Sequence, residues 1–383
     1  MRVQPFAFIK QEAEAAAAGP VTAFPDQSLT TWTTTTADDW LAYGASVLNT
    51  TTFAYSGSSV RIGSDYGTGV AKWQGGSLAS NGKIYTAPHV RTKWAVIDTD
   101  TDTITEPTTI VNGSSQGSVY DKITNQVISF GDGGTKIDCS TDTASNISGP
   151  PNRTTNPIQS FAGDELYGLG FFGYTGIRKY TVSTDTTSTV TPTGDAVINQ
   201  GEMGTLGRDG QIYTPNVPTP NITSKYNPDT NVNTQFARPG GENFTTIVQH
   251  YDGILYYLPQ SAFGTLRGYN PSTSSWVADY DWGTGFQVSN ACIGLDGRIY
   301  CVTGQSTGTV KWYDPTAGSD GTITISNSDT SYQGITIGKN GDLYLIPWTA
   351  AYFHKIPLVT GTGTTATDIV SQYNFGGRLC WPG

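Results

Sequence analysis

The stretch DGRIYCVT, residues 296–303, carries the pattern that decides the fold: a turn dipeptide, then a branched aliphatic residue and a tyrosine. The phrase recurs along the chain. Its other copies are NGKIYTAP (81–88), GDELYGLG (163–170), DGQIYTPN (209–216), DGILYYLP (252–259), NGDLYLIP (340–347) and a degenerate TNQVISFG (124–131), with Ile128 at the Tyr position. Successive Tyr positions are 43, 39, 46, 43, 44 and 44 residues apart. The chain therefore contains seven repeats with a period near 43 residues.

A second phrase follows the first at a fixed distance. Thirteen residues after the repeat tyrosine come Tyr180, Tyr226, Tyr269 and Tyr313, and the last three begin YNPDT, YNPST and YDPTA. Pro after Asn or Asp favours a turn. Each repeat is therefore expected to form four strands, which in the first repeat span about residues 74–80, 83–88, 93–98 and 103–111.

Four antiparallel strands in 40–45 residues are typical of a β-propeller blade. One such sheet cannot bury both of its faces, whereas neighbouring sheets in a ring cover each other. A parallel β-helix needs a shorter period, and a β-sandwich does not keep one period through seven copies. The sequence thus predicts an all-β fold, a seven-bladed β-propeller over residues 72–373.

The composition supports this fold class and narrows the partners. Only 14% of the residues are charged and 46 are Gly, which suits strands and turns. The net charge of −10 argues against duplex nucleic acid and anionic membranes as partners. No apolar run approaches the roughly 20 residues that span a bilayer. We therefore expect neither nucleic-acid binding nor membrane insertion.

The turn phrase Tyr-Asn/Asp-Pro-Ser/Thr resembles the repeats of kelch and related propellers. The kelch Gly-Gly doublet is clear only at Gly75-Gly76, and no Trp-Asp dipeptide ends a strand, which disfavours the WD40 type. The resemblance implies a propeller built from four-stranded blades.

The two ends of the chain lie outside the repeats. Residues 1–71 form a predicted N-terminal arm, in which Phe6, Phe8 and Ile9 are candidate docking residues for another protein's sheet edge. The alternative is an arm that lies along the propeller and caps it. Residues 374–383 form a predicted C-terminal tail. The acidic pair Glu12 and Glu14 interrupts the region where a secretory signal has its apolar core, so we expect synthesis in a cytoplasm without a signal peptide.

One pair among the four cysteines is informative. A two-residue Asp296-Gly297 turn would place Cys292 opposite Cys301, so a cross-strand disulfide is geometrically possible. Two reduced thiols in the core are the alternative, which a reducing compartment favours.

A search for catalytic groups yields little. His89, His250 and His354 share neither a repeat position nor a metal-binding spacing. Glu165, Glu202 and Glu242 fall near blade entrances, where a glycosidase pair is conceivable but cannot be measured from sequence. The Asp-rich run 98–103 lacks the spacing of an EF-hand. The sequence predicts no catalytic residue, no metal site and no cofactor.

Glutamine recurs near the start of every repeat. The set comprises Gln74, Gln116, Gln159, Gln200, Gln249, Gln287 and Gln333. Inner strands of a propeller line its axis, and amides both donate and accept hydrogen bonds. We expect a polar ring there, which either bonds the blades together or binds a sugar or a peptide.

Three classes of function fit these observations. The opening MRVQPFAFIK, with the Ala-rich and Thr-rich segments after it, resembles virion proteins of tailed bacteriophages. That resemblance implies a non-enzymatic virion structural protein, docked to capsid or tail by residues 1–71 and displayed for decoration or attachment to a host-surface glycan. The candidate glycan contacts are Trp282, Tyr280, Phe286, Phe171, Phe172 and Tyr174, and the alternative is that these aromatic side chains fill gaps between blades. The alternatives are a carbohydrate-active or lyase-type propeller enzyme and a kelch-like protein-binding scaffold.

Overall fold

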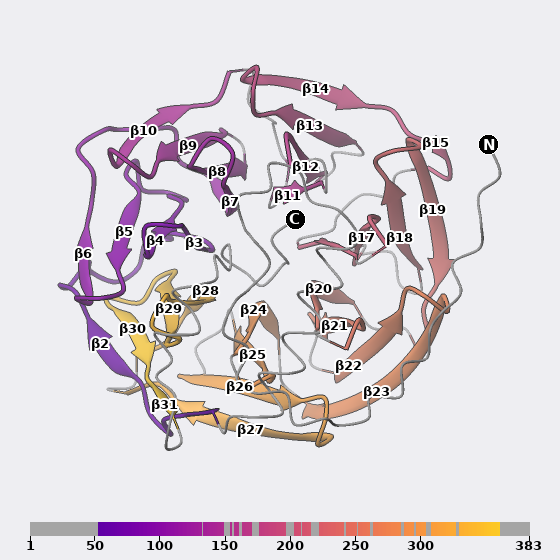
Figure 1. The fold of residues 1–383 in the computed structure, drawn as a ribbon. Coiled ribbons are helices and arrows are strands. Elements are labelled where there is room, and N and C mark those ends of the chain that lie inside the picture. Colours follow the sequence, from indigo (N-terminus) through magenta and orange to yellow (C-terminus); the bar gives the residue numbers. More distant parts are fainter. Residues whose placement is uncertain are drawn as a thin grey trace, which may run out of the picture.

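The computed structural model describes residues 53–360, except for 132, 149–153, 155–156, 161–162, 171–175, 197–202, 208, 216–221, 241–242, 251, 261–262, 285–286, 295, 304–307 and 327–328. Its strands form seven sheets around one axis and one small two-stranded sheet (Figure 1). The predicted all-β, seven-bladed β-propeller is confirmed. In this part of the chain, no helix is long and apolar enough to cross a membrane.

In blades 1 to 6, four consecutive strands run from the axis to the rim. Blades 1 to 3 contain β3 (Ser77–Leu78), β4 (Lys83–Thr86), β5 (Ala95–Asp98), β6 (Thr103–Thr105); β7 (Ser115–Asp121), β8 (Gln126–Gly131), β9 (Thr135–Asp138), β10 (Thr143–Asn146); and β11 (Ile158–Gln159), β12 (Glu165–Leu169), β13 (Ile177–Thr181), β14 (Thr186–Val190). Blades 4 to 6 contain β16 (Thr205–Leu206), β17 (Ile212–Thr214), β18 (Ile222–Asn227), β19 (Val232–Ala237); β20 (Phe244–Gln249), β21 (Leu255–Pro259), β22 (Phe263–Asn270), β23 (Ser275–Thr284); and β24 (Val288–Ile293), β25 (Ile299–Thr303), β26 (Thr309–Asp314), β27 (Ser319–Thr324). A short β15 (Thr193–Gly194) adds to the rim of blade 4 in parallel with β19.

The aliphatic–tyrosine dipeptide of the repeat explains why the sheets form a ring. Neighbouring residues of a strand point to opposite faces of the sheet. The aliphatic residue before the Tyr position is 0% exposed in every blade, and these residues are Ile84, Val127, Leu166, Ile212, Leu255, Ile299 and Leu343. The side chain at the Tyr position is at most 4% exposed. Both faces of each blade are therefore covered by neighbouring blades, which only a closed arrangement provides for all seven.

The dipeptide before the aliphatic residue forms the hairpin between the first and second strands. In five blades its glycine has a φ between 77° and 83°, the left-handed region that favours Gly, at Gly82, Gly210, Gly253, Gly297 and Gly341. The Asn or Asp before that glycine accepts a hydrogen bond from the backbone two residues on, as from Arg298 N to Asp296 Oδ1 at 3.1 Å. The same side chain also meets the repeat tyrosine, as where Tyr300 Oη donates to Asp296 Oδ2 at 2.6 Å. We call the side of the ring that carries these hairpins the hairpin face, and the opposite side the entrance face.

The turn between the third and fourth strands is also repeated. Its first residue, such as Asp98 or Asn227, accepts a backbone hydrogen bond from two residues on. Its last residue has a φ of 50–60° in six blades, at Asp102, Asp142, Asp185, Asn231, Ser274 and Gly318. Asn and Asp tolerate this conformation better than other non-glycine residues. The turn chemistry predicted from the second phrase is thus present in the structure.

Blade 7 takes its rim strand from the other end of the described chain. It consists of β28 (Tyr332–Ile337), β29 (Leu343–Pro347), β30 (Phe353–Ile356) and β2 (Val60–Ile62), and β2 pairs antiparallel with β30. This corrects the boundary predicted at residue 72, because part of the predicted arm belongs to the ring. A three-residue strand without the repeat phrase offers no periodic signal. The docking residues Phe6, Phe8 and Ile9, the predicted end at residue 373 and the tail 374–383 lie outside the described residues.

A second pairing lies beside this closure. β1 (Phe53–Tyr55) pairs antiparallel with β31 (Leu358–Thr360), so that Phe53 is opposite Thr360. Tyr55 Oη donates to Gly341 O at 2.9 Å, and its ring contacts that of Tyr300 at 4.9 Å between centroids. Both contacts are with residues in or next to the hairpins of blades 6 and 7. The first described strand therefore lies on the hairpin face.

Four residues around β2, here called the closure cluster, fasten it in place: Ser59, Arg61, Asp329 and His354. Arg61 donates to both carboxylate oxygens of Asp329, at 2.6 and 2.9 Å. His354 is 0% exposed; its Nε2 lies 2.8 Å from Asp329 Oδ2 and its Nδ1 lies 2.7 Å from Ser59 Oγ. Because the Asp329 carboxylate only accepts hydrogen bonds, Nε2 carries the proton, and Nδ1 of the neutral ring then accepts from Ser59 Oγ, which itself accepts from Ser326 N. This pattern assigns the neutral Nε2–H tautomer to His354.

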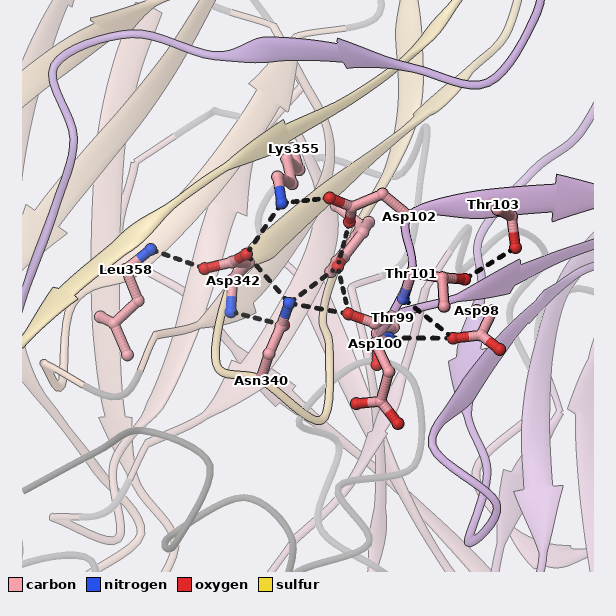
Figure 2. A network of polar contacts seen from close by, with 11 residues as sticks. Asp98, Thr99, Asp100, Thr101, Asp102, Thr103, Asn340, Asp342, Lys355 and Leu358 are labelled. Carbon is pink, nitrogen blue, oxygen red and sulfur yellow. Dashed lines mark hydrogen bonds and ion pairs between the residues drawn. The ribbon is translucent and has the colours of Figure 1, made fainter.

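The seam between blades 7 and 1 is held by a polar network (Figure 2). Asn340 Nδ2 donates to Tyr344 Oη and to Thr99 O, both at 3.0 Å, and Tyr344 Oη donates to Asp102 Oδ1. Lys355 contacts Asp102 as well as Asp342. The carboxylates of this Asp-rich turn are thus engaged by protein groups. The seam between blades 1 and 2 repeats the arrangement with Asn81, Tyr85 and Asp142.

The hairpin of blade 6 corrects the prediction for its two cysteines. The register places Cys292 opposite Tyr300 and Cys301 opposite Ala291, because the hairpin is longer than two residues. The two side chains therefore point to opposite faces of the sheet. Both are free thiols and 0% exposed, which confirms the alternative of two reduced thiols in the core and excludes a cross-strand disulfide.

Buried thiols should resist modification. Burial raises the pKa of Cys139 to about 12 and raises the pKa values of Cys292 and Cys301 as well. In a Cys380→Ser variant, used because Cys380 lies outside the described residues, we expect slow reaction with Ellman's reagent at pH 8. Three thiols should react after unfolding without a reductant. Fewer than three in the unfolded chain would reveal a disulfide and contradict the assigned register.

Candidate functional site

The predicted glutamine ring divides between two levels. Gln159 and Gln249 end their inner strands at the hairpin face, where Gln159 Nε2 donates to Asp121 Oδ1 at 2.8 Å and to Gly163 O at 2.7 Å. Both side chains are buried, and Gln159 bonds blade 3 to blade 2. They do not join the other glutamines, and Gln200 lies outside the described residues. A single ring of seven amides is therefore not formed among the described residues.

The other four glutamines lie where the inner strands begin, on the entrance face. Gln116 and Gln333 lie at register shifts near the start of β7 and β28. Gln287 directly precedes β24, and Gln74 lies three residues before β3. A β-bulge redirects the side chain that it contains. Gln116, Gln287 and Gln333 are partly exposed and Gln74 is 9% exposed.

The backbone at these strand starts adopts an uncommon conformation. Ser114 and Ser331, which precede β7 and β28, have φ values of 72° and 73°. Ser331 O accepts hydrogen bonds from Trp348 N at 3.0 Å and Thr349 N at 3.3 Å, while Ser114 N bonds His89 O. A serine with a left-handed backbone conformation costs free energy, and it is retained where surrounding contacts hold it in place. Here these bonds join the start of each inner strand to the loop that follows the second strand of a blade.

His89 and Trp348 complete the group that we call the entrance patch, together with Gln74, Gln116 and Gln333. His89 Nε2 lies 3.3 Å from Gln116 Nε2, and the His89 ring meets the Trp348 ring edge-on at 4.4 Å between centroids. Both rings are partly exposed. Three blades contribute: Trp348 and Gln333 come from blade 7, Gln74 and His89 from blade 1, and Gln116 from blade 2.

A close backbone contact brings the blade 7 and blade 1 parts of this patch together. A Cβ atom on Gly334 would lie 3.1 Å from Gly75 N, so the backbone segments of blades 7 and 1 meet directly beside Gln333 and Gln74. On the other side of blade 1, Ser77 Oγ and Ser118 Oγ are 2.9 Å apart. The three inner strands are thus in contact at this end of the ring.

Charged groups near the patch are engaged by the protein. Arg91 forms an ion pair with Glu106 at 3.0 Å and lies over the Trp73 ring at 4.9 Å. Lys72 is 1% exposed and donates to Ala350 O at 2.9 Å. Burial, together with the repulsion from Arg91, lowers the pKa of Lys72. The entrance patch itself consists of neutral amides, an imidazole and an indole.

The remaining candidate residues are held in structural contacts. His250 Nε2 lies 2.8 Å from Gly297 O on the hairpin face, and Glu165 pairs with Lys179 at 2.7 Å. Ser59, His354 and Asp329 are the residue types of a hydrolase triad, but Ser59 is 3% exposed and its hydroxyl already accepts from a backbone N–H. Glu202 and Glu242 lie outside the described residues. Among the described residues, no group of three or more His, Cys, Asp or Glu side chains is arranged to hold a metal ion.

Two of the aromatic residues proposed to contact a glycan, Trp282 and Tyr280, belong to the described part of the chain, and both pack against another aromatic ring. Trp282 is 4% exposed and packs against Tyr313, and Tyr280 lies against the same ring at 4.6 Å. These two pack between blades 5 and 6, in agreement with the alternative that the aromatic residues fill gaps between blades. Phe171, Phe172, Tyr174 and Phe286 lie outside the described residues. Trp348, which the sequence analysis did not single out, is the partly exposed aromatic beside the glutamines.

Comparison with known proteins gives no family. No protein-family model matches this chain, and no curated protein matches it. Solved structures do resemble it. A streptogramin B lyase aligns with a TM-score of 0.63 over 80% of this chain and 98% of its own, at 13% identity.

Two further structures give the same picture. A catalytically inactive virginiamycin B lyase from Staphylococcus aureus, solved with quinupristin, has a TM-score of 0.64 at 12% identity and covers 80% of this chain and 100% of its own. Hydrazine synthase from Kuenenia stuttgartiensis has a TM-score of 0.62 at 9% identity over 77% of this chain and 97% of its own. None of the three is a kelch or virion protein. These likenesses establish the propeller fold alone.

Proposed function

We propose that this protein is a non-catalytic structural protein of a virus particle, held by one face of its ring and displaying the other. The observation that carries the proposal is the separation of two features. β1 contacts the hairpin face through Tyr55 and Gly341, whereas Gln116 and Gln333 lie at the opposite ends of the inner strands. A ring attached at its hairpin face presents its entrance face to the surroundings.

The position of the chain ends supports attachment through the predicted arm. Phe53 and Thr360 are paired, so the first and last described residues lie together at one edge of the ring, beside blade 7. In the proposal, the arm binds other virion proteins of a capsid or tail.

A ring built mainly for display needs rigidity, and its polar groups provide it. Asp329, Glu165 and Asp102 each pair with a cation, and His250 and His354 bond neighbouring strands or hairpins. These are the groups that an acid–base mechanism would use. Their structural engagement supports a non-enzymatic role over the carbohydrate-active or lyase alternative.

Deletion of residues 1–20 tests the proposal. The deletion removes Phe6, Phe8 and Ile9 but leaves β1 and β2 intact, so the ring should keep its melting temperature. We expect incorporation into particles to fall at least tenfold, measured by quantitative immunoblotting of purified particles against the major capsid protein. The matched control is a chain with residues 361–383 intact and residues 10–20 replaced by a Gly/Ser linker of equal length.

Two results would contradict this proposal. Unaltered incorporation of the deleted chain would exclude docking through the arm. Turnover of a streptogramin B or an oligosaccharide by the purified full chain would replace the display role with the enzymatic alternative.

A further inference from the structure

We propose that the entrance patch binds a neutral oligosaccharide, with the Trp348 indole as the surface for a sugar ring and the amides of Gln116 and Gln333 for its hydroxyl groups. This deepens the proposed function, on which it rests, because it names the ligand class of the displayed face.

The amides of Gln287 and Gln333 at this face are partly exposed, whereas on the hairpin face Gln159 is bonded to protein groups and Gln249 is 2% exposed, with no hydrogen-bond partner for its Oε1 among the described residues. Among the described residues, the side chains of Gln74, Gln287 and Gln333 make no hydrogen bond, whereas Gln159 makes two to protein groups. A primary amide offers two donors and an acceptor with two lone pairs. A structural role would engage these groups in bonds between blades, as it does for Gln159. Gln333, positioned by a β-bulge and without a side-chain partner among the described residues, is suited to bind a ligand, and Gln116, which contacts His89, still offers its amide oxygen.

The aromatic pair adds a contact of different chemistry. The Trp348 ring is partly exposed, and His89 fixes it from the side at 4.4 Å while bonding Gln116. The backbone N–H of Trp348 is anchored to Ser331 O, next to β28 and Gln333. A flat apolar ring in the same patch as amide groups matches the alternating C–H faces and hydroxyl groups of a pyranose.

The charge of the patch selects among ligands. Arg91 and Lys72, which lie two residues along the chain from His89 and Gln74, are occupied by Glu106 and by Ala350 O. A phosphate or an acidic sugar would find no free cation among the patch residues. Neutral donors and acceptors favour a neutral sugar, and a peptide segment, which offers the same amide chemistry, is the competing outcome of the test.

The test uses the full-length chain on an array of neutral and acidic oligosaccharides, followed by ¹⁹F NMR of the 5-fluorotryptophan-labelled protein with the best binder. Trp348→Phe assigns the Trp348 signal, which we expect to shift on binding. Gln333→Ala and Gln116→Ala should each weaken binding about tenfold. Gln333 makes no side-chain bond among the described residues, so its variant should retain the melting temperature of the natural chain.

Gln126→Ala is the matched control. Gln126 is also partly exposed, but it begins β8 at the hairpin face, so its replacement should leave the affinity unchanged. Absence of any neutral binder, equal loss in Gln126→Ala, or a Trp348 shift produced by peptides and not by sugars would each overturn the inference. Because the assay uses purified protein, its failure is independent of whether residues 1–20 direct the chain into particles.

Discussion

Replacement of Ile62 by Asp should destabilise the whole ring, although Ile62 lies in a three-residue strand outside the repeats. Ile62 is 6% exposed within the largest hydrophobic cluster and pairs with Phe353 in β30. The substitution places a carboxylate in an apolar site and weakens β2, the strand that pairs with the rim edge of β30 in the described part of the chain. We expect the free energy of unfolding to fall by about 4 kcal/mol or more, measured by urea denaturation.

Val60→Asp is the matched control for this prediction. Val60 lies in the same strand, two residues away, but is 48% exposed. Its replacement should change the free energy of unfolding by no more than about 0.5 kcal/mol. Equal effects of the two variants would mean that β2 does not close the ring through its buried face.

Acidification should weaken the closure in a way that depends on His354. Burial lowers the pKa of His354, against the opposing attraction of Asp329, so the folded chain favours the neutral imidazole. The unfolded His has a pKa of about 6.5 and binds a proton first as the pH falls. The stability contributed by His354 is therefore present above about pH 6.5 and is lost as the pH falls through that value toward the folded pKa.

The Asp329 carboxylate affects the stability of the fold at lower pH. Burial tends to raise the pKa of Asp329, but the hydrogen bonds from Arg61 and His354 lower it overall. Its contribution to stability is present above the unfolded value of about 3.9 and is lost below it. Asp342, whose pKa is raised by burial, contributes with the opposite sign. A comparison of variants is therefore needed to isolate the histidine.

His354→Gln provides that comparison. Glutamine keeps a donor and an acceptor but does not titrate between pH 5 and 7. The natural chain should lose melting temperature from pH 7 to pH 5 by a larger amount than the variant does, measured by calorimetry at constant ionic strength. Arg61, Asp329, Ser59, Tyr332 and Tyr352 surround His354 or its partners and are unchanged. Identical pH dependence of the melting temperature in the two proteins would contradict a contribution of His354 to the loss of stability in acid.

The repeat was sufficient to predict the fold because one short phrase holds two kinds of information. In NGDLYLIP, Asn340 and Gly341 specify the hairpin, and Leu343 and Tyr344 specify the two buried faces of the next strand. Each phrase is local, so its meaning does not depend on distant contacts. Seven such phrases at one period leave a closed ring as the arrangement that buries every face.

The errors have equally physical causes. β2 pairs with a strand almost 300 residues away and lacks the phrase, so its position follows from closure and not from local pattern. The cysteine register depended on hairpin length, and a longer hairpin shifted the pairing by one residue and separated the two side chains.

The sequence contains a signal that separates the glutamines of the hairpin face from those of the entrance face. Gln159 and Gln249 precede their repeat tyrosines by eight and seven residues, whereas Gln74, Gln287 and Gln333 precede theirs by 11 to 13. Distance from the repeat tyrosine, unlike the interval between successive glutamines, tells which end of the inner strand a residue occupies. The contact between His89 and Trp348 joins blades 1 and 7 and required the structure.

Cryo-electron microscopy of the intact assembly that contains this chain tests the central claim most directly. The account predicts a seven-bladed disc attached to a neighbouring chain at the hairpin face beside blade 7, with the entrance patch facing outward. A disc attached through its entrance face, or a chain that copurifies with no particle, would contradict it.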